Sequence, residues 1–186
     1  MNFANACFNL LALIRSNLKA MAINAFNSGR YSCNLIVRIQ SHVRIVLDTN
    51  SRIRIGKGVL IASNSVISAT DGGQLSLGKM VGINRNSMIM CHDSITIGAN
   101  TIMGPGVYIY DHDHVFDSTD GVRRNEYVTA PISIGKNCWI GANTIILRGT
   151  TIGDNCLIAA GCVVKGIFPD GSVVIQKREE IIRQKC

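Results

Sequence analysis

ISIGKNCWIGANTIILRGTTIGDNCLIAAGCVV, residues 132–164, contains a six-residue repeat that decides the fold. Aliphatic residues stand six positions apart at Ile134, Ile140, Ile146, Ile152, Ile158 and Val164. A small side chain follows each of the first five by four residues, at Cys138, Thr144, Thr150, Cys156 and Cys162. A period of six matches neither an α-helix nor the two-residue alternation of a strand. It is typical of a parallel β-helix of triangular cross-section, with one hexapeptide on each face.

An aliphatic-Gly dipeptide extends the repeat toward the N-terminus. It begins at Ile55, Leu77, Ile97, Ile134 and Ile152, with spacings of 22, 20, 37 and 18 residues. We interpret 18 as one triangular turn, 20 and 22 as a turn with corner insertions, and 37 as two turns plus about one residue. Further aliphatic residues are in phase at Ile55, Ile61 and Ile67, at Leu77, Ile83 and Ile89, and at Ile97, Met103 and Ile109. These side chains are predicted to point into the prism from about residue 50 to about residue 167.

The domain organisation follows from where this repeat begins and ends. We predict an all-β protein with an N-terminal helical segment at 1–30, a β-helix at 31–168 and a tail at 169–186 that ends in a short helix. Residues 1–28 are partly apolar, but they lack the basic start and cleavage site of a signal peptide. Their apolar run is too short to span a bilayer. The preferred interpretation is a helix that caps one end of the solenoid. The alternative is a membrane-surface helix, favoured by Arg15 and Lys19.

Composition restricts the partners and the compartment. The seven cysteines have no disulfide-framework spacing, and Cys138, Cys156 and Cys162 fill core positions of the repeat. We therefore expect free thiols that serve as small hydrophobic residues in a reducing cytoplasm. The net charge of +7 suits an anionic partner. Aromatic residues make up only 5% and form no stacking platform, so a phosphorylated cofactor or an acidic glycan fits better than a nucleic acid.

The repeat is interrupted by YDHDHVFDSTDGVRRNEYVTAP, residues 110–131. A long loop excluded from a regular coil is usually functional. This one holds His112 and His114, flanked by Asp111 and Asp113. Neutral imidazole can take a proton from a hydroxyl near pH 7, so either histidine is a candidate general base. A solvated polar loop and a metal site are the alternatives.

Residues 130–165, APISIGKNCWIGANTIILRGTTIGDNCLIAAGCVVK, resemble the signature stretch of the hexapeptide-repeat O-acetyltransferases. The branch it resembles most contains the galactoside, maltose and capsule or O-antigen acetyltransferases. In that family a histidine on an excluded loop lies about two dozen residues before the Trp of a Trp-Ile-Gly turn. Here Trp139 begins that turn, and His114 lies 25 residues upstream. The resemblance covers roughly residues 75–178.

The resemblance implies a left-handed β-helix, a homotrimer with a site between subunits, and acetyl-CoA as donor. The acceptor hydroxyl would attack the thioester directly, so no cysteine carries the acetyl group and no metal is expected. The implied catalytic residues are His114 as base and Trp139 beside the thioester, with the amide of Ala142 facing the oxyanion. The implied coenzyme contacts are Ala142, Ala160, Lys165 and Arg178. The implied acceptor contacts are Asn84, His92, Asp93 and His112, and His112 could exchange roles with His114. The tail lacks the Gly-Asn-Pro-Ala-Lys-like run with which relatives often close.

The acceptor implied by the resemblance is a sugar hydroxyl of a surface polysaccharide or its precursor. The expected location is the cytoplasm, with the inner face of the membrane as a further option through residues 1–28. The alternatives are a small-molecule acceptor such as a free sugar, serine or a xenobiotic, and a metal-dependent protein of carbonic-anhydrase-like type. That last class would need His92, His112 and His114 as ligands. A catalytically silent scaffold is also left open.

Overall fold

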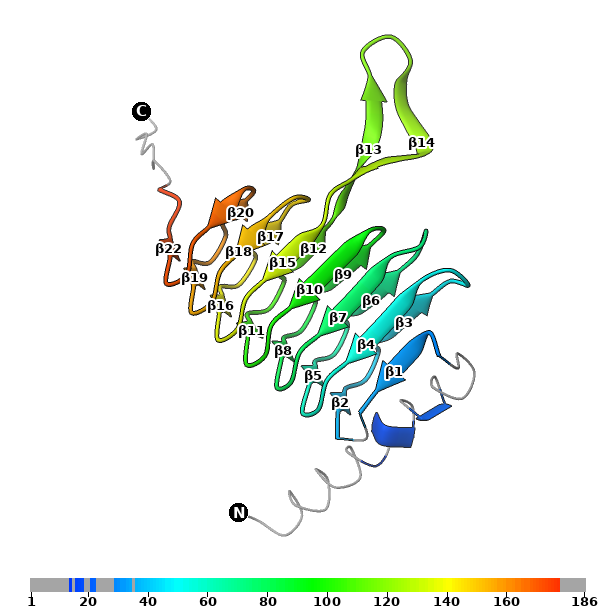
Figure 1. The fold of residues 1–186 in the computed structure, drawn as a ribbon, viewed down its shortest axis with the longest axis vertical. Helices are drawn as coiled ribbons and strands as arrows, with labels where there is room; N and C mark the ends of the chain where they lie inside the picture. The colour runs from blue at the N-terminus through cyan, green and yellow to red at the C-terminus, as the bar shows by residue number, and fades with distance from the viewer. Residues whose placement is uncertain (1–13, 15, 19–20, 23–28, 35, 178–186) are drawn as a thin grey trace, which may run out of the picture.

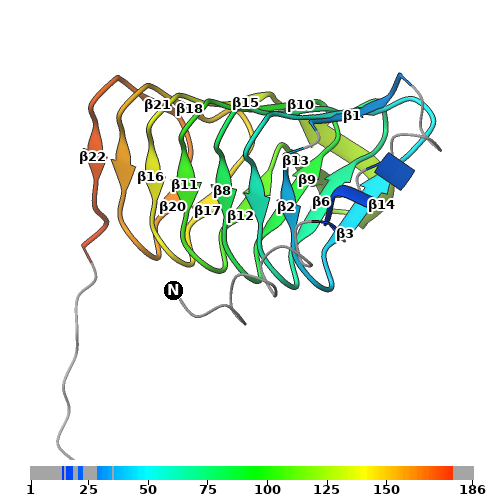
Figure 2. The same cartoon turned by 90° about the horizontal axis from the view of Figure 1, so that it is seen from below.

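The computed structural model describes residues 14, 16–18, 21–22, 29–34 and 36–177. Over this part the chain winds into a solenoid whose turns stack along one axis, and a hairpin projects from its side (Figure 1). Viewed from below, successive turns are stacked side by side along the solenoid axis (Figure 2). The parallel β-helix predicted from the six-residue repeat is confirmed.

Three parallel sheets form the faces of the prism, and we call them A, B and C in the order in which the chain visits them. Sheet A contains β1 (Tyr31–Cys33), β4 (Arg52–Ile55), β7 (Gln74–Leu77), β10 (Ser94–Ile97), β15 (Ile132–Ile134), β18 (Thr151–Ile152) and β21 (Ile167–Phe168). Sheet B contains β2 (Arg38–Ile39), β5 (Leu60–Ile61), β8 (Gly82–Ile83), β11 (Ile102–Met103), β16 (Trp139–Ile140), β19 (Leu157–Ile158) and β22 (Val173–Val174). Sheet C contains β3 (Arg44–Leu47), β6 (Val66–Ala69), β9 (Met88–Cys91), β12 (Tyr108–Tyr110), β17 (Ile145–Ile146) and β20 (Val163–Val164). The strand β22 lies beyond residue 168, where the sequence placed the start of the tail.

The strand register corrects one interpretation of the spacings. Ile97 pairs directly with Ile134, so the 37-residue interval is a single turn and not two. The extra residues of that turn leave the solenoid as an antiparallel hairpin of β13 (His112–Asp117) and β14 (Gly121–Thr129). Spacing alone could not separate these cases, because two turns of 18 residues and one turn with a long insertion have nearly the same length.

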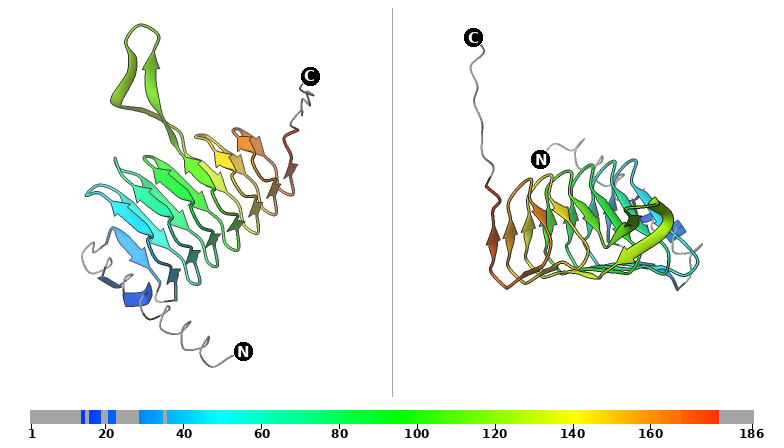
Figure 3. Two further views of the ribbon diagram at one scale, coloured as in Figure 1. Left: turned by 180° about the vertical axis from the view of Figure 1, so that it is seen from behind. Right: turned by 90° about the horizontal axis from the view of Figure 1, so that it is seen from above.

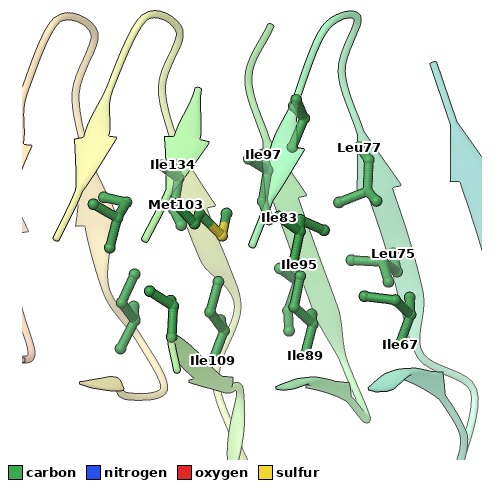
Figure 4. Packing of buried hydrophobic residues seen from close by; sticks show 14 of the residues in the cluster. Ile67, Leu75, Leu77, Ile83, Ile89, Ile95, Ile97, Met103, Ile109 and Ile134 are labelled. Carbon is green, nitrogen blue, oxygen red and sulfur yellow. The ribbon is translucent and has the colours of Figure 1, made fainter. Parts of the chain in front are cut away.

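The core is one continuous stack of aliphatic side chains inside the prism (Figure 4). Every in-phase aliphatic residue of the six-residue repeat is buried, with at most 4% of its surface exposed. The small residues at the fifth position are buried too, including Thr144 at 0% and Cys162 at 1%. Each inward side chain packs on the equivalent one in the turns above and below, because hydrogen-bonded parallel strands keep residues in register. The predicted inward positions are therefore confirmed.

The corner between sheets A and B shows why Gly and Asn recur in the repeat. A Cβ on Gly135 would lie 2.5 Å from the carbonyl carbon of Gly153 in the next turn, so only glycine fits there. Asn100, Asn137 and Asn155 have φ of 62°, 56° and 58°, a left-handed conformation that Asn tolerates well. Their amides form a ladder, since Asn100 Nδ2 donates to Asn137 Oδ1 and Asn137 Nδ2 to Asn155 Oδ1, each at 3.1 Å.

The described N-terminal residues Ile14, Ser16–Leu18 and Met21–Ala22 are helical. Ser16 Oγ donates to the Val37 carbonyl at 2.9 Å and accepts from the Ile39 amide at 2.5 Å, so it occupies the open edge of β2. No helix among the described residues has the length and apolarity needed to cross a bilayer. Residues 29–30, at the end of the predicted N-terminal helical segment, form a turn. The remaining residues of that segment, and almost all of the predicted C-terminal helix, lie outside the described residues.

Candidate functional site

A buried carboxylate fixes the base of the hairpin to the solenoid. Asp111 precedes β13 at the corner between sheets C and A, and it has no exposed surface. Its two oxygens accept from the backbone amides of His92 and Asp93 in the preceding turn, each at 2.8 Å. The Ala130 amide donates to the Asp111 carbonyl at 2.9 Å and closes the base from the other strand. The hairpin therefore leaves the solenoid from a hydrogen-bonded frame.

Two histidines stack against this frame. The rings of His92 and His112 are 3.6 Å apart at 10°, and Tyr127 of β14 meets both edge-on at 4.6 and 5.3 Å. His112 Nδ1 lies 3.2 Å from Asp111 Oδ1, and His92 Nδ1 lies 3.2 Å from Asp71 Oδ2 without hydrogen-bond alignment. Burial, and then the charge of His112, lower the pKa of His92 below its ordinary value. Neutral imidazole is thus the favoured form of His92 in the folded chain.

His114 lies two residues further along β13, on the same side of the strand as His112. It is exposed, and its ring centre is 4.8 Å from that of Tyr127. Asp113, on the other side of the strand, accepts from Arg148 Nε at 2.5 Å. Arg148 follows β17 in the next turn of the solenoid, so this ion pair braces the hairpin from the opposite direction to Asp111.

A shallow groove lies on the outer surface of sheet B. Its lining includes the predicted residues Asn84 and Trp139, together with Arg85, Ile102 and Gly82. Trp139 is 55% exposed because its neighbour Ile140 takes the inward position of β16. Gly82 is the outward residue of β8 and leaves a notch between Leu60 and Ile102, with which it pairs on either side. The groove combines an apolar floor with one cationic side chain and two amide side chains, those of Asn84 and Gln40.

The structure separates the predicted site residues into two groups within one chain. His92, Asp93, His112 and His114 gather at the C–A corner, at the base of the hairpin. Trp139 lies on sheet B, the face of the triangular prism opposite that corner, and points outward. The hairpin also projects away from the stack of turns (Figure 3). His114 and Trp139 of the same chain therefore do not share one pocket.

The predicted coenzyme contacts lie on the later turns. Ala142 and Ala160 stand on consecutive turns at the B–C corner, where the Gly161 amide donates to the Ala142 carbonyl at 2.7 Å. The Ala142 amide donates to no group among the described residues. Lys165 is exposed at the C–A corner, two turns beyond the hairpin, and Arg178 lies outside the described residues.

The three outer faces differ in polarity. The outward residues of sheet A are mostly polar, as with Arg54, Ser76, Thr96, Ser133 and Thr151. Those of sheet B are mainly apolar: Leu60, Gly82, Ile102, Trp139, Leu157 and Val173. Those of sheet C are also mainly apolar, apart from Arg44 on β3: Val66, Met88, Tyr108, Ile145 and Val163. Exposed apolar faces of this extent are typical of surfaces that bind another molecule.

Several site residues have no signal in the sequence. Tyr127, Arg148 and Arg85 come from an irregular loop or from repeat positions where polar residues are ordinary. Asp111 was visible only as a neighbour of His112. Its burial and its two amide contacts depend on the register between turns, which no local pattern reports. An Asp directly before a loop histidine is the one signal that could have pointed to it.

The described cysteines fit the expected role as small core residues. Cys91, Cys138, Cys156 and Cys162 are buried free thiols, and Cys33 is half-buried. Burial raises the pKa of the Cys91 and Cys138 thiols, which lowers their reactivity. Within residues 29–34 and 36–177, no three His, Cys, Asp or Glu side chains are arranged to hold a metal ion.

Comparison with known proteins gives matches to one family. Residues 131–165 match the model of the hexapeptide repeat of succinyl-transferase. A probable acetyltransferase of Mycobacterium tuberculosis, Rv3034c, is 32% identical over 73% of this chain and 45% of its own length. The putative lipopolysaccharide biosynthesis O-acetyl transferase WbbJ of Escherichia coli is 26% identical over 80% of this chain and 78% of its own length.

Among solved structures, the N-acyltransferase AntD of Bacillus cereus, in complex with a dTDP-amino sugar and coenzyme A, is similar with a TM-score of 0.66. Its identity is 19% over 83% of each chain, so the likeness concerns the fold alone. The chain spans about half the length of the first curated relatives it matches, from 45 to 57%.

Proposed function

We propose that this chain, a member of the hexapeptide-repeat acetyltransferase family, transfers an acetyl group from acetyl-CoA to a sugar hydroxyl. The observation that carries the proposal is the hairpin inserted between β12 and β15. It is braced by Asp111 and Arg148, and it presents the exposed His114 on a solenoid that is otherwise regular. A regular coil needs no such insertion for stability, so its rigid attachment supports a catalytic role.

In the proposed reaction His114 acts as general base. It takes the proton of the acceptor hydroxyl as the oxygen attacks the thioester carbonyl, which forms the new C–O bond. The tetrahedral intermediate then collapses and the C–S bond breaks. The departing coenzyme thiolate takes up the proton that the imidazole had accepted, which returns His114 to its neutral form. The Ala142 amide, which has no described partner, is suited to stabilise the oxyanion. Base catalysis of this kind contributes about a hundredfold to ten-thousandfold.

The site is proposed to lie between two chains of a homotrimer. One chain holds His114 and Trp139 on opposite sides, so a pocket with both requires His114 from one chain and Trp139 from another. The apolar faces B and C supply two different surfaces on each chain. If the outer face of sheet B in one chain packs on the outer face of sheet C in the next, the contact is head-to-tail. Three such contacts would close into a ring of three chains. The polar face A is left toward solvent.

Mixed oligomers test this shared site. His114→Ala and Trp139→Ala variants, each inactive alone, are expected to recover activity when co-expressed, because some interfaces then join an intact His114 to an intact Trp139. Acetyl transfer would be followed by mass spectrometry with acetyl-CoA and candidate glycans. A mixture as inactive as its parts would place both residues in one chain and contradict the proposal.

The coenzyme is proposed to lie along the later turns, near Ala142 and Ala160, with Lys165 and Arg178 toward its phosphates. The acceptor is proposed to be a hydroxyl of a surface polysaccharide or its precursor. The groove residues Asn84 and Arg85 support a polar acceptor with anionic character, and the relative named for lipopolysaccharide biosynthesis supports a glycan. Acetylation of free sugars or serine, with no glycan modified, would favour the small-molecule alternative.

Contact with the inner surface of a membrane is a further part of the proposal. Ile14, Leu18 and Met21 are 47, 60 and 51% exposed on the described helical residues. The adjoining segment 29–57 contains six Lys or Arg residues and one acidic residue. Apolar residues beside a basic surface suit an anionic bilayer.

Sedimentation with phosphatidylglycerol vesicles tests the membrane contact. Binding is expected to fall at least about tenfold for Leu18→Ser with Met21→Ser. Ile167→Ser, which changes an exposed apolar residue at the other end of the solenoid, should have no effect. Equal binding to neutral vesicles, or no binding, would remove the membrane from the proposal.

A further inference from the structure

We propose that the stacked imidazoles of His92 and His112 form a proton-sensitive clamp that holds the β13–β14 hairpin in its working orientation. The inference rests on the proposed function for the role of His114. The clamp itself rests on the geometry at the base of the hairpin.

The clamp joins three separate segments of the chain. His92 belongs to the turn that follows β9, His112 begins β13, and Tyr127 lies on the returning strand β14. The two imidazoles are 3.6 Å apart and nearly parallel, while Tyr127 lies at 86° to one ring and 84° to the other. Both strands of the hairpin therefore contact the same solenoid side chain. Loss of the His92 ring would leave a gap against both strands.

Carboxylates flank the stack at both ends. Asp71 lies 3.2 Å from His92 Nδ1, and Asp111 lies 3.2 Å from His112 Nδ1. The other titratable side chains that face the stack are His114, Tyr127 and Tyr110. The two imidazole side chains are only 8 and 13% exposed, so water screens little between them. One proton on the pair is balanced by the carboxylates. A second would place two cations face to face in a buried position.

The effect of pH on the clamp depends on whether its closed or its open state binds more protons. With the clamp closed, burial and the neighbouring His112 hold the pKa of His92 below its ordinary value of about 6.5. With the clamp open, His92 is solvated and its pKa returns to that value. The open state therefore takes up more protons as pH falls below about 6.5, and the closed clamp loses stability in that range. Above that pH it stays closed.

The clamp acts on the reaction through His114 alone. His114 lies two residues after His112 on the same side of β13, and its ring also contacts Tyr127. Opening the stack would displace the proposed base without touching the groove or the coenzyme contacts. His92 is accordingly a positioning residue, and not a catalytic one.

Hydrogen exchange on the full chain, read by mass spectrometry, tests the clamp without relying on activity. After correction for intrinsic rates, the wild-type β13–β14 amides are expected to exchange at least about threefold faster at pH 5.5 than at pH 7.5. His92→Phe keeps a flat ring but cannot be protonated, so its hairpin should stay protected at both pH values. His92→Ala should exchange rapidly at both. His42→Ala, a histidine on the first turn, is the matched control and should behave as wild type.

Kinetics give the second measurement. His92→Ala is expected to lower kcat about tenfold at pH 7.5 while KM for acetyl-CoA is unchanged, because only the position of the base is lost. Equal hairpin protection in wild type and His92→Ala, or a pH effect that persists in His92→Phe, would overturn the clamp. Should His92→Phe fail to fold, His112→Phe tests the same stack from the hairpin side. If no acceptor is acetylated, the proposed function is contradicted. The hydrogen-exchange measurements would still test the clamp, because they do not depend on activity.

Discussion

At the scale of single residues, position in the six-residue repeat decides what a substitution does. Inward residues such as Ile146 have no exposed surface, whereas outward ones such as Trp139 are half exposed. The two kinds alternate along strands of only two residues. Within one strand, the inward residue therefore contributes to stability, and the adjacent outward residue is free to contribute to function.

His114→Ala tests the base. Turnover is expected to fall at least about a hundredfold, since no other group on that side of β13 replaces the imidazole except His112, which is held by Asp111. Binding of acetyl-CoA, measured by calorimetry, should change little. His42→Ala serves as the control. An active His114→Ala enzyme together with an inactive His112→Ala enzyme would transfer the role to His112.

Ile146→Asp tests the inward position. An unpaired carboxylate in the stack should cost several kcal/mol, enough to unfold much of a marginally stable domain. Arg148→Ala, on the same turn, should cost no more than about 1 kcal/mol, because its ion pair with Asp113 is partly exposed. Thermal melts of both variants give the comparison. Similar melting temperatures would mean that the inward register has been misassigned.

At the scale of elements, the hairpin is an insertion that the solenoid does not need. β10 and β15 pair directly across it, and the Ala130 amide already reaches the Asp111 carbonyl at its base. The chain can leave and re-enter the solenoid at one point. The contacts of Asp111, the histidine stack and the Arg148 pair give the hairpin a fixed orientation.

Replacement of residues 112–129 by a short Gly-Ser turn tests this independence. The variant is expected to fold, with an unchanged β-sheet spectrum and a melting temperature within a few degrees of wild type, while acetyl transfer is lost. The solenoid survives because each turn depends on its neighbours and not on the hairpin. A variant that aggregates or melts far lower would show that the hairpin is part of the folding unit.

At the scale of the whole molecule, the prism has one polar and two apolar outer faces. A monomer would expose Ile102, Trp139 and Val163 at about half of their surface each. In the proposed trimer, burial of these faces between copies would stabilise the closed oligomer and would bring the hairpin of one chain to the next. Oligomerisation and catalysis would then depend on the same surfaces.

Light scattering is expected to report a trimer. Ile102→Glu, which places a charge on the apolar face of sheet B, should shift the protein toward monomer and reduce activity at least about tenfold. Thr151→Glu, the matched change on the polar face of sheet A, should leave both unchanged. A wild-type monomer with full activity would contradict the trimer and the shared site together.

The sequence by itself determined the β-helix, its inward positions and the place where the regular coil is broken. These follow from local periodicity. Each hexapeptide has the same arrangement of inward and outward residues, so the pattern within a short stretch of sequence is enough to predict it. The break in that regularity indicated His112 and His114 as candidates, whereas Trp139 was a candidate through the family resemblance.

Only the tertiary structure decided how the interruption is built and what surrounds it. The 37-residue interval is one turn with a hairpin, and the carboxylate of Asp111, the His92–His112 stack and the Arg148 pair hold that hairpin. These contacts join residues 18 to 35 positions apart, across turns whose lengths differ. The length of each turn sets which side chains meet at a corner, and that length depends on the pairing of strands that no local pattern encodes.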